Sequence, residues 1–274
     1  MREGKKMTSK ELAWKIRRHG IEMTHISHGS HIGAILSVAD IVAVLYNDVL
    51  CVHPDNPKAP SRDRFILSKG HAGAAVYAAL AEKGFFDVEE LKTHYLDGSR
   101  LSGHVSHKNV PGVELSTGSL GHGIGVGSGM ALVAKMDDLD FRVFVIMGDG
   151  ECNEGSVWEA ALFANHHKLS NLVVVIDHNK LQSLDLCENT IKLENLGDKW
   201  RQFGWHVVEV DGHDHVALYN ALESSESDSP TCVIANTIKG KGVSFMEGEV
   251  LWHYRDPQGE LYNQAVQELE DQRP

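Results

Sequence analysis

The stretches FRVFVIMGDG (141–150) and NLVVVIDHN (171–179) decide the fold. Each is a short, continuous run of apolar and β-branched residues, the pattern of a strand that is covered on both faces of a parallel sheet. Polar residues close each run, Asp149 in the first and Asn179 in the second. Because the carboxyl ends of parallel strands lie along one edge of a sheet, we expect a carboxylate and an amide to meet there.

Further segments alternate between strand and helix patterns. WHVVEVDG (205–212) and TCVIANTI (231–238) are apolar runs of the same kind, and they too are expected to be strands covered on both faces. Helices are predicted over ELAWKIRRHGIEM (11–23), ADIVAVLYNDVL (39–50), HAGAAVYAALAEKG (71–84) and LGHGIGVGSGMALVAKM (120–136). Capping-box spacing, Thr8 with Glu11 and Ser37 with Asp40, predicts where the first two begin. The fold class that follows is α/β: a doubly wound parallel sheet with helices on both faces and a ligand crevice at the carboxyl ends of the strands.

Length and composition limit the class of protein. The chain has 274 residues, 42% of them hydrophobic, and we expect one domain over 1–274 with a peripheral tail from residue 256 or so. No apolar run is expected to span a bilayer, and a net charge of −12 argues against nucleic acid or an anionic membrane as the main partner. The four cysteines are widely spaced without CxxC, which favours reduced thiols and a cytoplasmic location.

The polar residues that end the two opening runs suit magnesium. Mg²⁺ prefers octahedral oxygen coordination and usually takes one or two carboxylates, with phosphate oxygens and water at the other positions. Asp149, the side-chain oxygen of Asn179 and the carbonyl of Leu181 would supply three oxygens, and a diphosphate would supply others. Gly148 and Gly150 flank Asp149 and let a bulky anion approach. GDG alone is often only a strand-ending turn, but its pairing with DHN favours the metal site.

Seventeen histidines form a second signal, because several of them stand beside glycine in loops. An imidazole with an ordinary pKa of about 6.5 can gain or lose a proton near neutral pH, and a neighbouring glycine leaves room for a substrate. These glycine-rich contexts are SHIG (30–33), SKGHAG (68–73), SGH (102–104) and GHG (121–123). A structural or surface role is expected for His19, His94, His166, His167 and His215.

The stretch GDGECNEGSVWEAALFANHHKLSNLVVVIDHN (148–179) resembles the thiamine diphosphate motif of the transketolase family, and the similarity runs from about Arg17 to His253. The resemblance implies a thiamine diphosphate-binding fold of the diphosphate-binding (PP) type, with thiamine diphosphate and Mg²⁺ as cofactors. By the same resemblance, the catalytic residues that contact substrate oxygens and move protons are His31, His71, His104 and His253. This chain departs from the family loops at SHIG, GHVSHKN and WHYR, so His28 and His107 remain alternatives to their neighbours.

Further cofactor contacts follow from the same resemblance. The segment VPGVELSTGSLGHGIGVGSGMA (110–131) matches the family's glycine-rich segment, and backbone N–H groups at such a helix start can hold diphosphate oxygens. The cofactor-binding residues expected are His71, Gly118, Leu120, Gly121, Gly150, Glu154 and Asn179. Glu154 matches a family glutamate that links paired active sites, and a first-turn helix charge is the structural alternative. His122 stands where glutamine is common in the family, and its role stays open.

The resemblance also implies ketol transfer and a separate second half. It predicts a transketolase that moves a two-carbon ketol unit from a ketose, or its phosphate, to an aldose, with the organic chemistry supplied by the cofactor. Whole transketolases carry a pyrimidine-binding domain after this region, whereas this sequence stops soon after His253. We therefore expect the N-terminal subunit of a split transketolase, which joins a C-terminal subunit in a heterotetramer.

Two alternatives to a transketolase stay open. The cofactor could serve a 1-deoxyxylulose-phosphate synthase-like or ketoacid-decarboxylating enzyme, although LSKGHA (67–72) and the histidines favour transketolase. A subunit that binds the cofactor without catalysis is the non-enzymatic alternative. A generic nucleotide-binding domain is disfavoured, because GIGVGSG (123–129) lacks a preceding strand and no Walker A sequence is present.

Overall fold

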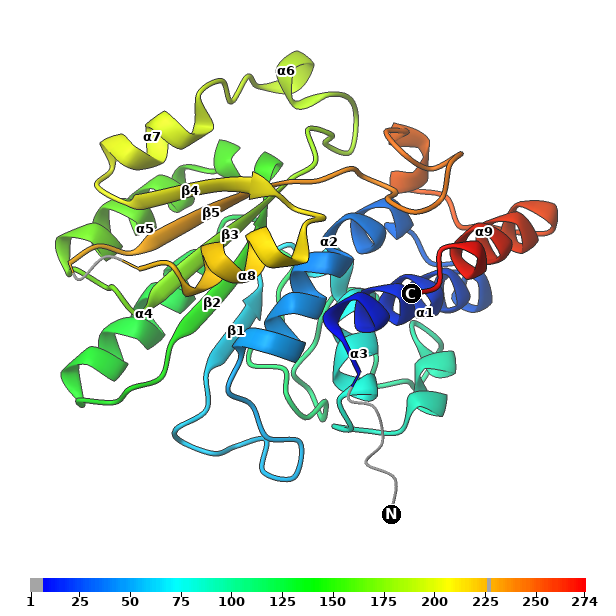
Figure 1. Ribbon diagram of the computed structural model, residues 1–274, viewed down its shortest axis with the longest axis horizontal. Helices are drawn as coiled ribbons and strands as arrows, with labels where there is room; N and C mark the ends of the chain where they lie inside the picture. The colour runs from blue at the N-terminus through cyan, green and yellow to red at the C-terminus, as the bar shows by residue number, and fades with distance from the viewer. Residues whose placement is uncertain (1–6, 226–227) are drawn as a thin grey trace.

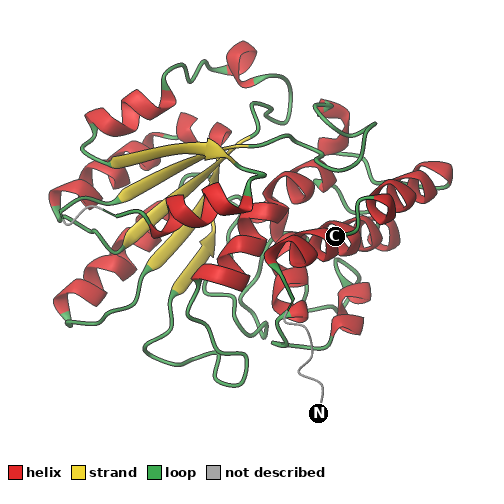
Figure 2. Ribbon diagram, viewed as in Figure 1, coloured by secondary structure: helices red, strands yellow, loops and turns green. Residues whose placement is uncertain are grey.

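A parallel sheet of five strands forms the centre of the computed structural model, which describes residues 7–225 and 228–274 (Figures 1 and 2). The strands are β1 (Arg64–Leu67), β2 (Val143–Gly148), β3 (Leu172–His178), β4 (His206–Asp211) and β5 (Thr231–Asn236). Their order across the sheet is β1-β2-β3-β5-β4, and every neighbouring pair is parallel. The prediction of an α/β fold with a parallel sheet is confirmed.

Helices cover both faces of this sheet, with α2 and α8 in front of it in Figure 1. The helices are α1 (Ser9–Ser27), α2 (Ile32–Val44), α3 (Gly73–Glu82), α4 (Gly123–Met136), α5 (Gly155–His166), α6 (Cys187–Thr190), α7 (Leu196–Gln202), α8 (His215–Glu223) and α9 (Glu260–Asp271). Short turns of 3₁₀ helix include η2 (Gly70–Ala72), η4 (Asp149–Asn153) and η5 (Val250–His253). One hydrophobic core joins α1, α2, α3 and α8 to the sheet, and a second joins α4, α5 and α7 to its other face.

The two predicted capping boxes have different outcomes. The Thr8 box is confirmed, because Thr8 Oγ1 accepts from the Glu11 N–H (3.2 Å) and the Glu11 carboxylate accepts from the Thr8 N–H (2.7 Å). The Ser37 box is wrong, because α2 already begins at Ile32 and Ser37 lies inside it. The buried Ser37 hydroxyl donates instead to the Asp177 carboxylate (2.7 Å), a tertiary contact that local spacing cannot reveal.

The sheet edges also differ from expectation. Strand β1 was not predicted, because RFIL has only four residues and begins with a charged side chain. Strand β4 was predicted to be covered on both faces, but it pairs only with β5 in the sheet order and its Glu209 and Asp211 are exposed. That part of the prediction is wrong, because Glu209 and Asp211 lie two residues apart on one face of β4, and that face is open to solvent.

Two helical segments near the ends of the chain complete the fold. Within the described residues, Ile32–Val49 is long and apolar enough to cross a membrane by length and composition, which corrects the expectation from sequence. This is weak evidence, because 83% of the window is buried inside the protein, as in a core helix. Helix α9, in the predicted tail, packs on α1, where Trp14 Nε1 donates to the Leu269 carbonyl (2.7 Å).

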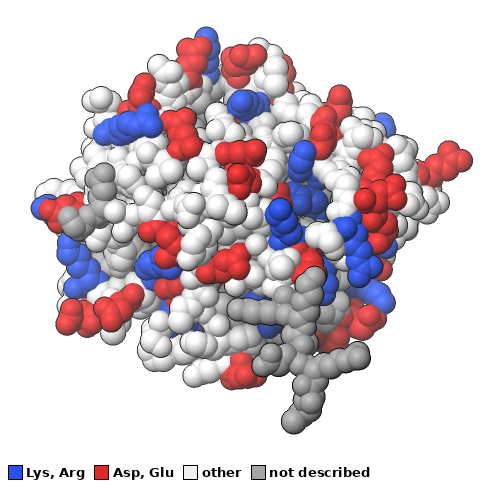
Figure 3. Space-filling model, viewed as in Figure 1, with Lys and Arg blue, Asp and Glu red and all other residues white. Residues whose placement is uncertain are grey.

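Figure 3 shows charges of both signs across the visible face, with acidic side chains gathered over α9.

Candidate active site

A cavity of about 460 Å³ lies where strands β2 and β3 end. The predicted site residues that line it are His31, His71, His104, Gly118, Leu120, Asp149, Gly150, Glu154, Asn179, Leu181 and His253. They come from η2 after β1, from the segment between α3 and α4, from the residues that follow β2 and β3, from the residue just before α2 and from η5. The parallel sheet therefore gathers residues from most of the chain at one edge, as expected for an α/β crevice.

Four histidine rings face one another in this cavity. The ring centroid of His31 lies 5.1 Å from that of His71, 5.6 Å from that of His104 and 4.8 Å from that of His253. His31 has a left-handed backbone conformation (φ 74°) just before α2, and its N–H donates to the His253 carbonyl (2.8 Å). The ring of Tyr254 lies 4.7 Å from that of His253. The structure thus brings the four histidines together, and their catalytic roles stay predictions.

Burial keeps these imidazoles neutral. Burial, assisted by nearby positive charges, lowers the pKa of His31 to about 4. Burial and the charge of Lys239 lower the pKa of His253 to about 3. Burial also holds the pKa of His71 well below its ordinary value and lowers the pKa of His104. At neutral pH each ring therefore offers one N–H donor and one acceptor nitrogen, which suits hydroxyl and carbonyl oxygens.

The histidines that sequence left ambiguous lie outside the cavity lining. The His28 side chain is 73% exposed, and its Nδ1 lies 3.0 Å from the Asp256 carboxylate. The Nδ1 of His107 lies 2.8 Å from the Ser116 hydroxyl, and His122 is exposed at the start of α4. The cavity therefore contains His31 rather than His28, and His104 rather than His107.

Asp149 is a buried carboxylate without an ion pair to any residue in the described part of the chain. It is 2% exposed and accepts from two backbone N–H groups, those of Gly150 (2.8 Å) and Lys180 (2.6 Å). Burial, reinforced by the negative charge of Asp177, raises the pKa of Asp149. A divalent cation would supply the missing positive charge, so the chemistry of this carboxylate fits Mg²⁺.

The other two predicted metal ligands lie in the same wall. Asn179 is 9% exposed, and its Oδ1 accepts from the Leu181 N–H (3.1 Å). The Leu181 carbonyl accepts from the Lys239 ammonium (3.1 Å). Among the described residues, no group of three or more His, Cys, Asp or Glu could hold a metal. A metal at Asp149 would therefore depend on amide, carbonyl, phosphate and water oxygens, the set that suits Mg²⁺.

Glu151 lines the cavity and is bonded to three segments around it, although no sequence pattern pointed to it. Its Oε1 accepts from the Ser68 hydroxyl (2.6 Å) and the Gly121 N–H (2.9 Å), and its Oε2 accepts from the Gly148 N–H (2.9 Å). Gly121 has a φ of +80°, and a Cβ there would lie 2.7 Å from the Glu154 Cβ. The Gly121 N–H, predicted to hold diphosphate, is thus engaged by Glu151, and Gly121 itself is not part of the cavity lining.

Two buried lysines are further cavity residues that sequence reasoning missed. Lys69 is 1% exposed and forms an ion pair with Asp177, which is fully buried at the end of β3. Lys239 is 2% exposed, and its ammonium lies 3.1 Å from the Nδ1 of His253. Burial lowers the pKa of Lys239 to about 8. The signal that could have found them is the position of each lysine within or just after an apolar run. A lysine there is expected to be buried, and a buried lysine needs a partner.

Fold and site together define a class: α/β proteins that bind a ligand at the carboxyl edge of a parallel sheet. The family model described as transketolase, thiamine diphosphate binding domain, matches residues 8–260. The match covers most of the chain, and the chain belongs to the transketolase family.

Individual relatives agree with this assignment. The chain is 44% identical to an apulose-4-phosphate transketolase subunit from Phocaeicola vulgatus, over 94% of this chain and 92% of that protein. It is 43% identical to the 6-deoxy-6-sulfo-D-fructose transketolase subunit SqwG of Clostridium sp., over 88% of each chain. The transketolase structure from Campylobacter jejuni superposes with a TM-score of 0.90 at 31% identity, over 96% of this chain. The chain spans 42% of the length of that solved transketolase.

Proposed function

We propose that this chain is the N-terminal, diphosphate-binding subunit of a split transketolase, which transfers a two-carbon ketol unit from a ketose or its phosphate to an aldose or its phosphate. The observation that carries the proposal is the group of four neutral histidines beside Asp149 in one cavity. The names of two relatives, an apulose-4-phosphate and a 6-deoxy-6-sulfo-D-fructose transketolase subunit, support a sugar substrate that carries an anionic group.

The cofactor pair in this proposal is thiamine diphosphate with Mg²⁺. Thiamine diphosphate supplies, when bound, a nucleophilic carbon and an electron sink. Asp149, the side-chain oxygen of Asn179 and the Leu181 carbonyl would hold the metal. Gly118 and Gly150 line the same cavity, where the absence of side chains leaves room for a diphosphate.

The histidines have the proton chemistry that ketol transfer needs. The Lys239 ammonium faces the Nδ1 of His253 at 3.1 Å, so this nitrogen accepts and the ring proton lies on Nε2. His253 can therefore donate to a substrate oxygen through Nε2. The neutral rings of His31, His71 and His104 can bind sugar hydroxyls and accept or return protons at them.

Partner binding is supported by apolar side chains on helices α4 and α5. Val126, Val133 and Met136 of α4 are 37%, 50% and 74% exposed, and Leu162 and Phe163 of α5 are 58% and 40% exposed. Helices α4 and α5 pack on each other, so these side chains lie on neighbouring elements. Exposed apolar groups of this kind are typical of interaction surfaces. We propose a C-terminal subunit with the pyrimidine-binding domain as the partner, in a heterotetramer.

Native mass spectrometry of the chain, purified gently from its own organism with Mg²⁺ present, tests the proposal. We expect a complex with a second subunit that carries thiamine diphosphate and transfers ketol units between sugars. A chain that is found alone, and that takes up no thiamine diphosphate when this is supplied with Mg²⁺, would contradict the proposed function. Strong pyruvate decarboxylation by the complex, without ketol transfer, would point instead to the ketoacid class.

A matched pair of histidine variants separates a catalytic subunit from one that only binds the cofactor. His104 lines the cavity, whereas His107 in the same loop does not. We expect His104→Asn to lower kcat of the assembled complex about a hundredfold, the usual contribution of a positioned proton-transfer group, and His107→Asn to leave it within about threefold. Equal, small effects in an intact complex would favour the non-catalytic role.

A further inference from the structure

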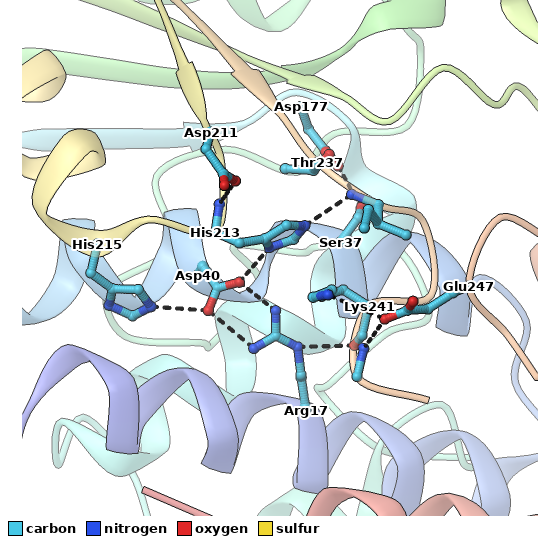
Figure 4. A network of polar contacts seen from close by, with 12 residues as sticks. Arg17, Ser37, Asp40, Asp177, Asp211, His213, His215, Thr237, Lys241 and Glu247 are labelled. Carbon is cyan, nitrogen blue, oxygen red and sulfur yellow. Dashed lines mark hydrogen bonds and ion pairs between the residues drawn. The ribbon is translucent and has the colours of Figure 1, made fainter. Parts of the chain in front are cut away.

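A second buried carboxylate, Asp40, lies outside the cavity and collects four hydrogen bonds (Figure 4). Arg17 of α1 donates to both oxygens, through Nη1 to Oδ1 (3.0 Å) and through Nη2 to Oδ2 (2.5 Å). His213 Nδ1 lies 2.6 Å from Oδ2, and His215 Nε2 lies 3.0 Å from Oδ1. Burial alone would raise the pKa of Asp40, but Arg17 and the two histidines hold it well below its ordinary value. Asp40 is therefore ionised and fully partnered.

His213 connects Asp40 to a further segment of the chain. Its Nε2 accepts from the backbone N–H of Ile238 (2.9 Å). A backbone N–H can only donate, so Nε2 carries no proton and the ring proton lies on Nδ1. The Nδ1–H then donates to Asp40, which holds the ring in one tautomer and one orientation. Two hydrogen bonds therefore connect the Asp40 carboxylate, the His213 imidazole and the main-chain amide of Ile238.

That amide lies between Thr237, which is bonded to Asp177 beside the cavity, and Lys239, which lines the cavity. The Thr237 hydroxyl donates to the carboxylate of Asp177, next to β2 in the sheet. The Lys239 ammonium donates to the Leu181 carbonyl (3.1 Å) and faces the Nδ1 of His253 (3.1 Å). A shift of Ile238 would therefore move both contacts together.

The same segment is clamped on its far side. The Gly240 N–H donates to the Gly33 carbonyl at the start of α2 (2.9 Å), and Arg17 Nε donates to the Lys241 carbonyl (3.1 Å). Asp40 belongs to α2 as well, so one helix presents both the histidine anchor and the Gly33 contact. Segment 237–241 is thus fixed to α1, to α2 and, through His213, to the loop after β4.

We propose that His213 is a positioning residue of the active site, which holds Thr237 and Lys239 in place through the Ile238 N–H. This inference rests on the proposed function, because ketol transfer is one of its readouts. His213 does not line the cavity, and within the described residues its ring is hydrogen-bonded to Asp40 and to the Ile238 N–H, so it acts through the backbone. Its contribution therefore appears in how precisely Lys239 and His253 are placed, which affects the rate of the chemical step more than sugar binding.

His215 provides the matched control. It donates to the same carboxylate as His213, at 3.0 Å where His213 is at 2.6 Å, and it starts α8. Its other ring nitrogen is buried without a hydrogen-bond partner among the described residues, so the His215 side chain is not bonded to segment 237–241. If the Asp40 cluster only stabilised the fold, the two histidines would be equivalent.

Three substitutions separate these roles in the complex of this chain with its partner subunit. His213→Asn keeps a donor near the position of Nδ1 but cannot reach Ile238. His213→Gln places an acceptor amide oxygen within reach of the Ile238 N–H, which makes it the conservative rescue variant. His215→Asn removes one donor from Asp40 and leaves Ile238 untouched.

Hydrogen–deuterium exchange at peptides spanning 237–241 and steady-state kinetics are the two readouts. We expect His213→Asn to speed exchange there about tenfold and to lower kcat about tenfold while KM for the sugars stays within about threefold. His213→Gln should recover most of both, and His215→Asn should change neither while lowering Tm. Equal effects of His213→Asn and His215→Asn on exchange, or unchanged exchange in His213→Asn, would overturn the proposal.

Exchange also separates this inference from the proposed function. If the wild-type complex transferred no ketol unit, the proposed function would fail. Exchange at 237–241 and the affinity of the complex for thiamine diphosphate with Mg²⁺ would still test the positioning role of His213. Faster exchange in His213→Asn alone would support it, and identical exchange in all variants would refute it.

Discussion

Asp149 and Asp177 stand at the same edge of the sheet, where Gly148 of β2 pairs with Asp177 of β3, yet their surroundings are opposite. Asp177 is fully buried and receives the Lys69 ammonium, the Thr237 hydroxyl and the Ser37 hydroxyl (2.7 Å). Burial alone would raise its pKa, but Lys69 and these hydroxyls lower it instead.

Asp149 is almost as buried, but its hydrogen-bond donors in the described part of the chain are two backbone N–H groups and the Cys187 thiol, none of them charged. Burial and the charge of Asp177 therefore raise its pKa. The difference indicates a division of labour. A carboxylate whose charge is already balanced contributes to the fold, whereas an unbalanced one is available to a cation. Asp177 therefore stabilises the fold around the site, and Asp149 is the carboxylate whose charge a metal ion would balance.

Removal of the Asp177 charge should have the largest effect. Asp177→Asn leaves the Lys69 ammonium buried without its counter-charge, and breaking a buried pair from one side costs about 3–5 kcal/mol. We expect urea unfolding to show a loss of this size, and the added substitution Lys69→Met to recover part of it. Comparable stability of Asp177→Asn and the wild type would show that Asp177 is not the structural member of the two.

Asp149→Asn should act on the cofactor rather than on the fold. We expect the affinity for thiamine diphosphate at saturating Mg²⁺ to fall about a hundredfold, which corresponds to about 2.7 kcal/mol. Unfolding of the metal-free chain should be unchanged or slightly harder, because an unbalanced buried charge is removed. Calorimetric titration of the complex measures the first effect. Unaltered cofactor affinity would contradict the assignment of Asp149 as a metal ligand.

The pH dependence of stability should separate the two carboxylates by sign. The folded-state pKa of Asp177 is lowered, so its stabilisation is present above its ordinary value of 3.8 and is lost as pH falls through the folded value. The folded-state pKa of Asp149 is raised, so its carboxylate weakens the metal-free fold at high pH, and this effect disappears as pH falls towards 3.8.

Unfolding with a chelator present, at neutral pH and at about pH 4, measures this difference. The stability gained by Asp149→Asn should shrink on acidification, whereas the loss caused by Asp177→Asn should persist to about pH 4. Parallel pH profiles for the two variants would mean that the two carboxylates have similar environments, contrary to the structure.

The sequence located Asp149 but did not show that its carboxylate lacks a counter-charge. Apolar runs and their polar ends predicted β2, β3, β5 and the cavity edge, because strand patterns and strand ends are local features. The glycine-flanked histidines were also found locally. Lys69, Glu151 and Lys239 were missed, because their significance depends on burial and on partners far along the chain, such as Asp177 for Lys69, 108 residues away. The Ser37–Asp40 spacing misled for the same reason: both side chains make contacts across the fold.

Ser37→Ala provides the smallest test of the comparison, because it removes one donor from Asp177 and leaves Lys69 and Thr237. We expect a loss of about 1.5 kcal/mol in urea unfolding, the lower end for a hydrogen bond to a charged group. Ser128 is the matched control. Both hydroxyls are buried within helices and lie near a carbonyl of the preceding turn. Ser128 donates its single proton to that carbonyl, whereas Ser37 has a closer, charged acceptor in the Asp177 carboxylate (2.7 Å).

Ser128→Ala should therefore cost clearly less, because a hydroxyl that bonds only its own helix contributes little. The excess cost of Ser37→Ala should also vanish in the Asp177→Asn background, since the charge that strengthens the bond is gone. If the two serine variants were equally destabilised, or if an excess cost of Ser37→Ala persisted in the Asp177→Asn background, the Ser37 hydroxyl would matter for packing alone. Lys69 and Thr237 would then be left to account for the lowered pKa of Asp177.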